Sequence, residues 1–386
     1  MATYKRTISD EESSFNSDIE MFSHCKRLKR PKLTELSEGK LNDVGVFFSM
    51  KPISMDNLIK NLKILQKGSK GSGDFPTTID SLKKFTGDLL SFSLPCVNWN
   101  KKSTLPIALM LQEVEIEQES LMIICTINKT LSDFYEKTRW RGNDNLPTLI
   151  LTDRLNNRLF EHWYHKVFLF VSGMKEILEK LINPCPVPPG KYSDQEILQE
   201  SVFTQIFLKF AQICFLNPEV GEASKKCLKI RNKTVGYISD VRFYQHETKA
   251  GSPHLLMLLV EVKNNGLSQT DGDKDSATPW IEGYLDKCIL EPIGLQLMSD
   301  IWNSTFAPST LAVVCMRTEV IFMLLEADLE HYEAWLINKN TDNFKSFIQY
   351  TRSYNIMVAD DRRQLLDLLF WLGCSQKGDF ERYFFF

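Results

Sequence analysis

The feature that most constrains the fold of this chain is an almost continuous apolar run, Leu255–Val260, that ends in the tripeptide Glu261-Val262-Lys263. A run of this length without polar alternation predicts a strand that is buried on both faces, and therefore a sheet with covering layers on both sides. Strand alternation places Glu261 and Lys263 on one face and Val262 on the other. Because buried charges are costly unless they are paired or bind a metal, this strand end is a candidate site.

Context distinguishes this tripeptide from two others of the same form. The sequence holds three E-x-K tripeptides, at 38–40, 247–249 and 261–263. The first lies in a polar N-terminal segment and the second in a polar turn, so neither predicts a buried site. Only the third ends an apolar strand.

A second acidic residue, Asp240, precedes this strand at a short distance along the chain. Residues 235–244 form a strand-like pattern, and residues 246–253 predict a turn, so the two strands are natural hairpin partners. Such a hairpin can bring Asp240 next to Glu261. Two carboxylates and the Val262 carbonyl are the oxygen ligands that Mg²⁺ (or Mn²⁺) prefers, and an ammonium group at Lys263 can stabilise charge on a phosphate.

The stretch from about Ser193 to Leu325 resembles the PD-(D/E)XK nuclease superfamily, which has the restriction-endonuclease-like fold. The resemblance consists of a helix, the strand with Asp240, the strand with Glu261-Val262-Lys263, a further helix and a further strand. The proline that the family places before the aspartate is absent, because Ser239 stands there. A narrower likeness is to the nuclease domains of Crinkler-type effectors and mobile-element-linked proteins.

The resemblance implies a set of site residues. Asp240, Glu261 and the Val262 carbonyl would bind the metal, and Lys263 would aid the attacking water. A glutamate on the first helix would complete the site; Glu200 matches this position best, because it shares a helical stripe with apolar residues, and Glu196 is the alternative. Gln296, on the helix after the E-x-K strand, corresponds to a glutamine found in some members.

The expected function is therefore metal-dependent hydrolysis of phosphodiester bonds in DNA, with RNA as an alternative substrate. Two other functional hypotheses stay open: a catalytically inactive protein of the same fold that binds nucleic acid or acts as an effector, and a purely structural partner protein. At the level of the residues, Asp240 could instead be a solvated acid near a turn. Glu261 and Lys263 could then form a salt bridge at a strand end.

The chain is expected to have three parts. Residues 1–43 lack periodicity and predict a disordered tail, residues 44–190 predict a mixed α/β accessory region, and residues 191–386 predict the nuclease-like domain. The boundary follows the proline-rich segment 184–190, which cannot continue a helix. The expected fold class is α/β, with a restriction-endonuclease-like mixed central sheet flanked by helices. Within the accessory region, residues 107–127 contain two short apolar runs that are typical of strands.

Two basic clusters indicate partners. Residues 26–32 hold five basic residues in seven, which predicts recognition by the nuclear import machinery and a nuclear location, with the cytoplasm as an alternative. Residues 225–233 hold five in nine and, if they lie near the cleft, could neutralise phosphates. The candidate nucleic-acid-binding residues there are Lys225, Lys226, Lys229, Arg231 and Lys233; a solvated loop is the alternative.

Composition excludes some other classes. The formal net charge of −3 excludes a polycation that coats nucleic acid by bulk charge. Nine scattered cysteines without C-x-x-C spacing argue against a structural zinc site and agree with a reducing compartment. No apolar run reaches the length that a membrane span requires, so no membrane partner is expected. The sequence leaves the oligomeric state open.

Overall fold

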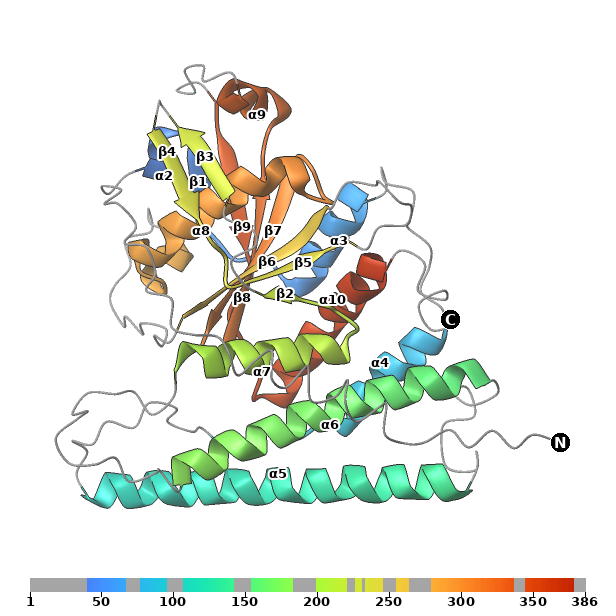
Figure 1. Ribbon diagram of the computed structural model, residues 1–386. Helices are drawn as coiled ribbons and strands as arrows, with labels where there is room; N and C mark the ends of the chain where they lie inside the picture. The colour runs from blue at the N-terminus through green and yellow to red at the C-terminus, as the bar shows by residue number, and fades with distance from the viewer. Residues whose placement is uncertain are drawn as a thin grey trace. The chain divides into compact units, whose positions relative to one another are not determined.

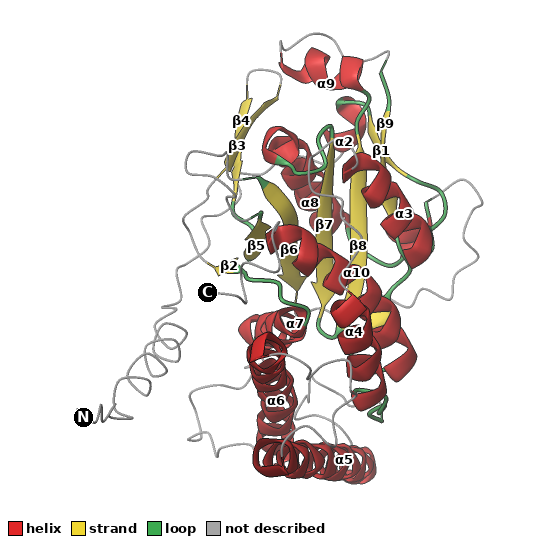
Figure 2. Ribbon diagram, turned by 90° about the vertical axis from the view of Figure 1, so that its right-hand side faces the viewer, coloured by secondary structure: helices red, strands yellow, loops and turns green. Residues whose placement is uncertain are grey.

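The computed structural model describes ten segments of the chain: residues 40–66, 77–95, 107–141, 154–182, 199–220, 226–230, 233–245, 255–263, 279–336 and 344–377. These segments belong to one compact unit, Gly39–Phe386. The unit is built around a mixed β-sheet with helices on both of its faces (Figures 1 and 2).

The main sheet has the strand order β1-β9-β8-β7-β6-β5-β2, and β10 pairs with β8 beside this path. Its strands are β1 Val46–Phe48, β2 Glu219–Val220, β5 Val241–Tyr244, β6 Leu256–Lys263, β7 Ser309–Met316, β8 Glu319–Glu326, β9 Ser346–Tyr350 and β10 Tyr354–Asn355. A separate two-stranded hairpin consists of β3 Lys226–Ile230 and β4 Lys233–Tyr237. The predicted α/β class is therefore confirmed.

Helices of 4 to 35 residues accompany this sheet. Their bounds are α2 Lys40–Asp43, α3 Met55–Gln66, α4 Thr77–Leu89, α5 Ile107–Arg141, α6 Arg154–Ile182, α7 Glu200–Ile213, α8 Lys287–Asp300, α9 Leu329–Leu336 and α10 Ala359–Lys377. Two short 3-10 helices, η3 Trp280–Gly283 and η4 Ile301–Asn303, flank α8.

The centre of the sheet is a hairpin followed by a crossover. β5 and β6 are antiparallel, with Val241 opposite Val260. β6 and β7 are parallel, and α8 lies in the connection between them. β7 and β8 then form a tight antiparallel hairpin. Because β6 and β7 are parallel, their carboxyl ends meet at one edge of the sheet, which is where ligands bind in open α/β sheets.

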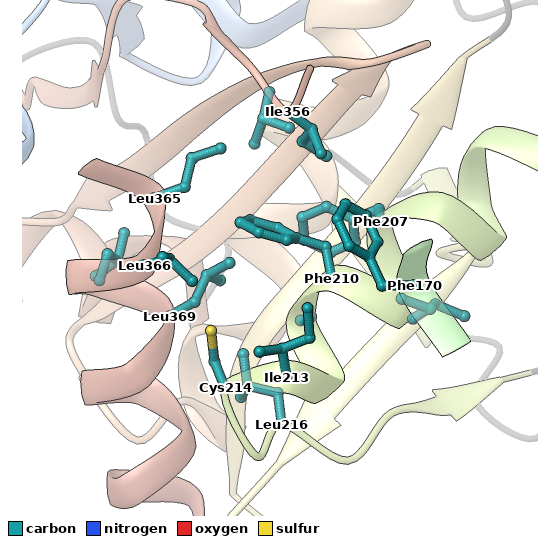
Figure 3. Close-up of a cluster of buried hydrophobic side chains, with 14 of the residues drawn as sticks. Phe170, Phe207, Phe210, Ile213, Cys214, Leu216, Ile356, Leu365, Leu366 and Leu369 are labelled. Carbon is teal, nitrogen blue, oxygen red and sulfur yellow. The ribbon is translucent and has the colours of Figure 1, made fainter. Parts of the chain in front are cut away.

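Two apolar layers hold the sheet. Val260 and Val262 point to the face where α6, α7 and α10 contribute the main hydrophobic cluster, part of which Figure 3 shows around Phe207 and Leu369. Glu261 points to the other face, which α8 covers. All but the last residue of β6 are buried, as the apolar run predicted.

The region expected as an accessory α/β part is mainly helical in its described residues. The strands expected within residues 107–127 are wrong, because these residues belong to the 35-residue helix α5, which packs against α6. Short apolar runs fit a strand and a buried helix equally well, and here the helix has the greater length. From the same region, β1 joins the main sheet by pairing with β9. The proline-rich segment 184–190 and residues 1–39 lie outside the described residues.

In the C-terminal part, the expected strand over 235–244 divides into β4 and β5, which belong to different sheets. Residues 238–240 separate them, so Asp240 lies at the entry to β5 rather than within a strand. Helix α8 continues through Pro292. Strands β9 and β10 lie between α9 and α10 along the chain.

Candidate functional site

Asp240 and Glu261 approach each other because of the β5–β6 register. Val241 lies opposite Val260, so one further step along the hairpin places Asp240 opposite Glu261. Residues that face each other across an antiparallel pair project from the same face of the sheet. The hairpin therefore puts the two carboxylates at the carboxyl end of β6, as the sequence predicted.

The backbone of Val262 orients Asp240. The Val262 N–H donates a hydrogen bond of 2.7 Å to Asp240 Oδ2. In an antiparallel pair, the N–H and C=O of one residue point to the same neighbouring strand, so the Val262 carbonyl also points past the end of β5. Its oxygen thus lies on the side of β6 that Asp240 occupies.

Lys263 carries the positive charge of the site. Its Nζ donates a hydrogen bond to Glu261 Oε1 and lies 3.8 Å from Glu200 Oε1. Glu200 is the first residue of α7, a helix that begins at this end of the sheet and packs on β6 with its apolar residues. The helix thus brings its first side chain to the E-x-K strand. Glu261 and Lys263 are mostly buried, with side chains 10% and 18% exposed, so their pairing takes place largely out of water.

Burial raises the pKa of Asp240 from 3.8 to about 7, and the negative charge of Glu261 adds to this shift. The Val262 N–H and the Lys263 ammonium act in the opposite direction. A buried carboxyl group whose pKa is raised in part by a neighbouring carboxylate is in an electrostatic condition that a bound cation relieves. Such a perturbed acid marks a functional-site candidate.

Helix α8 supplies a layer of polar contacts beneath the carboxylates. Gln296 Nε2 donates to Glu261 Oε2 over 3.3 Å, while the buried Gln296 Oε1 has no hydrogen-bond partner among the described residues. One turn later, Asp300 pairs with Arg242 of β5 through two hydrogen bonds, of 3.0 and 3.3 Å, and both side chains are almost completely buried. Ser239 Oγ accepts a further bond from Arg242 Nε.

Gln296 was predicted from the sequence, whereas the Arg242–Asp300 pair was not. The signal that could have found it is the spacing of four between Gln296 and Asp300 on a helix whose other buried residues are apolar or glycine, since residues at i and i+4 share a helix face. Arg242, two residues after Asp240, shares a strand face with it.

The basic run before the site lies on the β3–β4 hairpin. Lys226 and Lys229 belong to β3, and Lys233 begins β4. The two strands pair from Lys226 with Tyr237 to Ile230 with Lys233, so Lys226, Lys229 and Lys233 lie on strands and not in the loop that was the alternative. Lys225 and Arg231 lie outside the described residues, as does Glu196, the alternative to Glu200.

The site offers oxygen ligands that suit a hard cation such as Mg²⁺, but only a few of them. Asp240 and Glu261 offer carboxylate oxygens and Val262 a carbonyl oxygen, the ligand type of Mg²⁺ and Mn²⁺. Within the described segments, no group of three or more histidine, cysteine, aspartate or glutamate side chains is arranged to hold a metal ion. Glu200, the third acid, contacts Lys263.

Comparisons with protein-family models, with curated proteins and with solved structures find no match for this chain. Across the segments that the structure describes, no helix combines the length and the apolar character needed to cross a membrane.

Proposed function

We propose that this protein is a metal-dependent nuclease of the PD-(D/E)XK type that hydrolyses phosphodiester bonds in DNA. The observation that carries the proposal is the cluster at the end of β6. Asp240, opposite Glu261 in the hairpin register, has a pKa raised to about 7, and Lys263 adjoins Glu261. The order α7, β5, β6, α8, β7 supports the restriction-endonuclease-like fold as part of the same proposal.

The residues fit a resident Mg²⁺ or Mn²⁺. Asp240, Glu261 and the Val262 carbonyl would hold it, and Glu200 would assist through its contact with Lys263. When bound, the ion supplies a Lewis acid that stabilises negative charge on the scissile phosphate. The Val262 N–H holds the Asp240 carboxylate in place, and Gln296 does the same for Glu261.

Lys263 has the second chemical role. Its ammonium lies beside the Glu261 carboxylate, where it can orient a water molecule and stabilise charge on the phosphate oxygens. The burial of its side chain strengthens these interactions, because the local dielectric is lower than that of water. Neighbouring acids keep the ammonium in one position.

The proposed substrate is a polyanion, and the β3–β4 hairpin supports this choice. Lys226, Lys229 and Lys233 lie on strands that lead within a few residues to Asp240. Lysines at this place would neutralise phosphates that flank the scissile bond. With the basic cluster at 26–32 as an import signal, the nucleus is the proposed location.

A cleavage assay tests the proposal. Supercoiled plasmid, single-stranded DNA and RNA are incubated with the full chain in Mg²⁺, Mn²⁺ or EDTA. The parent is compared with Asp240→Ala, Lys263→Ala and the control Lys175→Ala, which removes a surface lysine paired with Glu179 on α6. Metal-dependent cleavage by the parent and control, lost in both site variants, is expected. Metal-dependent cleavage that persists in both site variants would contradict the assignment of Asp240 and Lys263 to the catalytic site.

A second candidate is a nucleic-acid-binding or effector protein that keeps this fold without catalysis. The observation that favours it is the small donor set, since the third acid contacts Lys263. The same assay separates the two candidates. Binding of DNA without cleavage in any metal would select the second.

A further inference from the structure

The tight turn between β7 and β8 lies at the end of the E-x-K strand. β6 and β7 are parallel and in register, with Lys263 opposite Met316, and Met316 is opposite Glu319 across the hairpin. Only Arg317 and Thr318 form the turn. The Arg317 N–H donates a 3.0 Å hydrogen bond to the Lys263 carbonyl. The turn is therefore fastened to the residue that bears the proposed catalytic ammonium.

Arg317 has an unusual backbone conformation for its residue type. Its φ is 59°, in the left-handed region, while that of Thr318 is not positive. A two-residue hairpin loop with a positive φ at its first residue favours glycine there, because a side chain at this position is strained. Conformations of this kind gather at functional sites, where the surroundings hold them in place.

The surroundings do hold this turn. Thr318 is buried, and its carbonyl accepts a 2.9 Å hydrogen bond from the Ile356 N–H. With the Arg317–Lys263 bond, both residues of the turn are thus anchored to other parts of the sheet. Arg317 itself is half-buried. Because the backbone is already fixed, ordering of the main chain adds little to the cost of binding a ligand through this side chain.

From this placement we infer that Arg317 binds a backbone phosphate of the nucleic acid beside the scissile bond. The inference rests on the proposed function and adds a second contact point at the carboxyl edge of the sheet. The site's other described charged side chains, Asp240, Glu261, Glu200 and Lys263, give it an excess of negative charge, which repels a phosphate. An arginine at the same edge supplies planar, bidentate recognition of phosphate oxygens.

The test uses a substitution that the turn should tolerate. Arg317→Gly provides the residue that this turn geometry favours, so its melting temperature should equal or exceed that of the parent. Binding of a short fluorescent DNA duplex is measured by anisotropy in EDTA over a series of KCl concentrations. We expect roughly five- to tenfold weaker binding and a slope of log K against log salt that is smaller by about 1.

Two further variants complete the design. Lys175→Gln, on α6, changes the net charge equally and should leave the affinity and the slope as in the parent. Arg317→Lys should restore the slope and part of the affinity, because it keeps a charge without the planar fork. In Mg²⁺, Arg317→Gly should lose cleavage at low DNA concentration and recover it at saturation.

The outcomes distinguish this inference from the proposed function. A parent that cleaves DNA, with an Arg317→Gly variant of equal affinity and slope, overturns the role of Arg317 and leaves the nuclease proposal standing. A melting temperature that falls in Arg317→Gly also overturns it, since the arginine would then be a structural part of the turn. A parent that cleaves nothing defeats the proposed function itself.

Discussion

The main-chain N–H of Val262 donates a 2.7 Å hydrogen bond to the carboxylate of Asp240, which joins the entry of β5 to the centre of the E-x-K tripeptide. The bond orients a carboxyl group that does not ionise readily. Burial and the negative charge of Glu261 raise the pKa of Asp240 to about 7. The Asp240 side chain is therefore both held in one orientation and costly to ionise. A group in this state should reveal itself in the stability of the metal-free protein.

We expect the stability of the protein in EDTA to fall as the pH rises from 5 to 8. The pKa of Asp240 is about 7 in the folded protein, against an ordinary value of 3.8. The folded state therefore retains a proton that the unfolded state has lost. The stability from this proton is fully present below pH ~4 and is lost as the pH rises through 7. Denaturant midpoints measured at several pH values check this.

Asp240→Asn is the matched control for this titration. The asparagine Oδ1 can still accept the Val262 hydrogen bond but cannot ionise. We expect the gain over the parent to be roughly 2–3 kcal/mol larger at pH 8 than at pH 5, because one pKa unit corresponds to about 1.4 kcal/mol. Equal effects at both pH values would show that Asp240 titrates normally.

Magnesium should stabilise the parent more at pH 8 than at pH 6. Protons and the cation compete for the Asp240 carboxylate, so binding strengthens as the carboxylate ionises. At one hundred times its Kd, a ligand that binds only the folded state adds about 2.7 kcal/mol. Thermal melts with and without Mg²⁺ provide the measurement. The double variant Asp240→Asn/Glu261→Gln should show no Mg²⁺-dependent shift; an unchanged shift there would place the ion elsewhere.

Lys263→Ala should reduce the cleavage rate by about 100- to 1000-fold, the usual cost of removing a group that stabilises charge in the transition state. The remaining fold should be intact, because Lys263 is the last residue of β6 and the substitution leaves the pairing of this strand unchanged. Single-turnover rates at saturating DNA measure the effect, and circular dichroism checks folding. If Lys175→Ala on α6 lost as much activity, a general loss of positive charge would explain both results.

The sequence predicted the centre of the fold well, because its signals there are strong. The run Leu255–Val260 predicted a strand buried on both faces, and the register of one hairpin then decided the position of Asp240 relative to Glu261. The site positions of Glu200, Gln296 and Lys263 were predicted from the helix or strand to which each belongs. All three lie in the cluster with Glu261.

Other parts were beyond prediction for physical reasons. The apolar runs in 107–127 are too short to separate strand from helix, and the long helix α5 is decided by its packing against α6. The break between β4 and β5 depends on a change of partner strand, which no local pattern records. No sequence pattern pointed to Arg317, because its left-handed backbone conformation arises only in the folded hairpin.

The buried pair Arg242–Asp300 should behave as a single structural unit beneath the site. Asp300→Ala leaves the Arg242 guanidinium buried without its carboxylate partner, and we expect a loss of about 3–5 kcal/mol in the free energy of unfolding. Arg242→Met should reduce the free energy of unfolding by a similar amount, because it leaves the Asp300 carboxylate buried without the guanidinium. The double variant Arg242→Met/Asp300→Leu should lose clearly less than the sum of the single variants, because neither charge remains buried alone. Chemical denaturation of the four proteins measures the coupling. Additive losses would mean that the two side chains do not depend on each other, and that β5 is held against α8 by apolar packing alone.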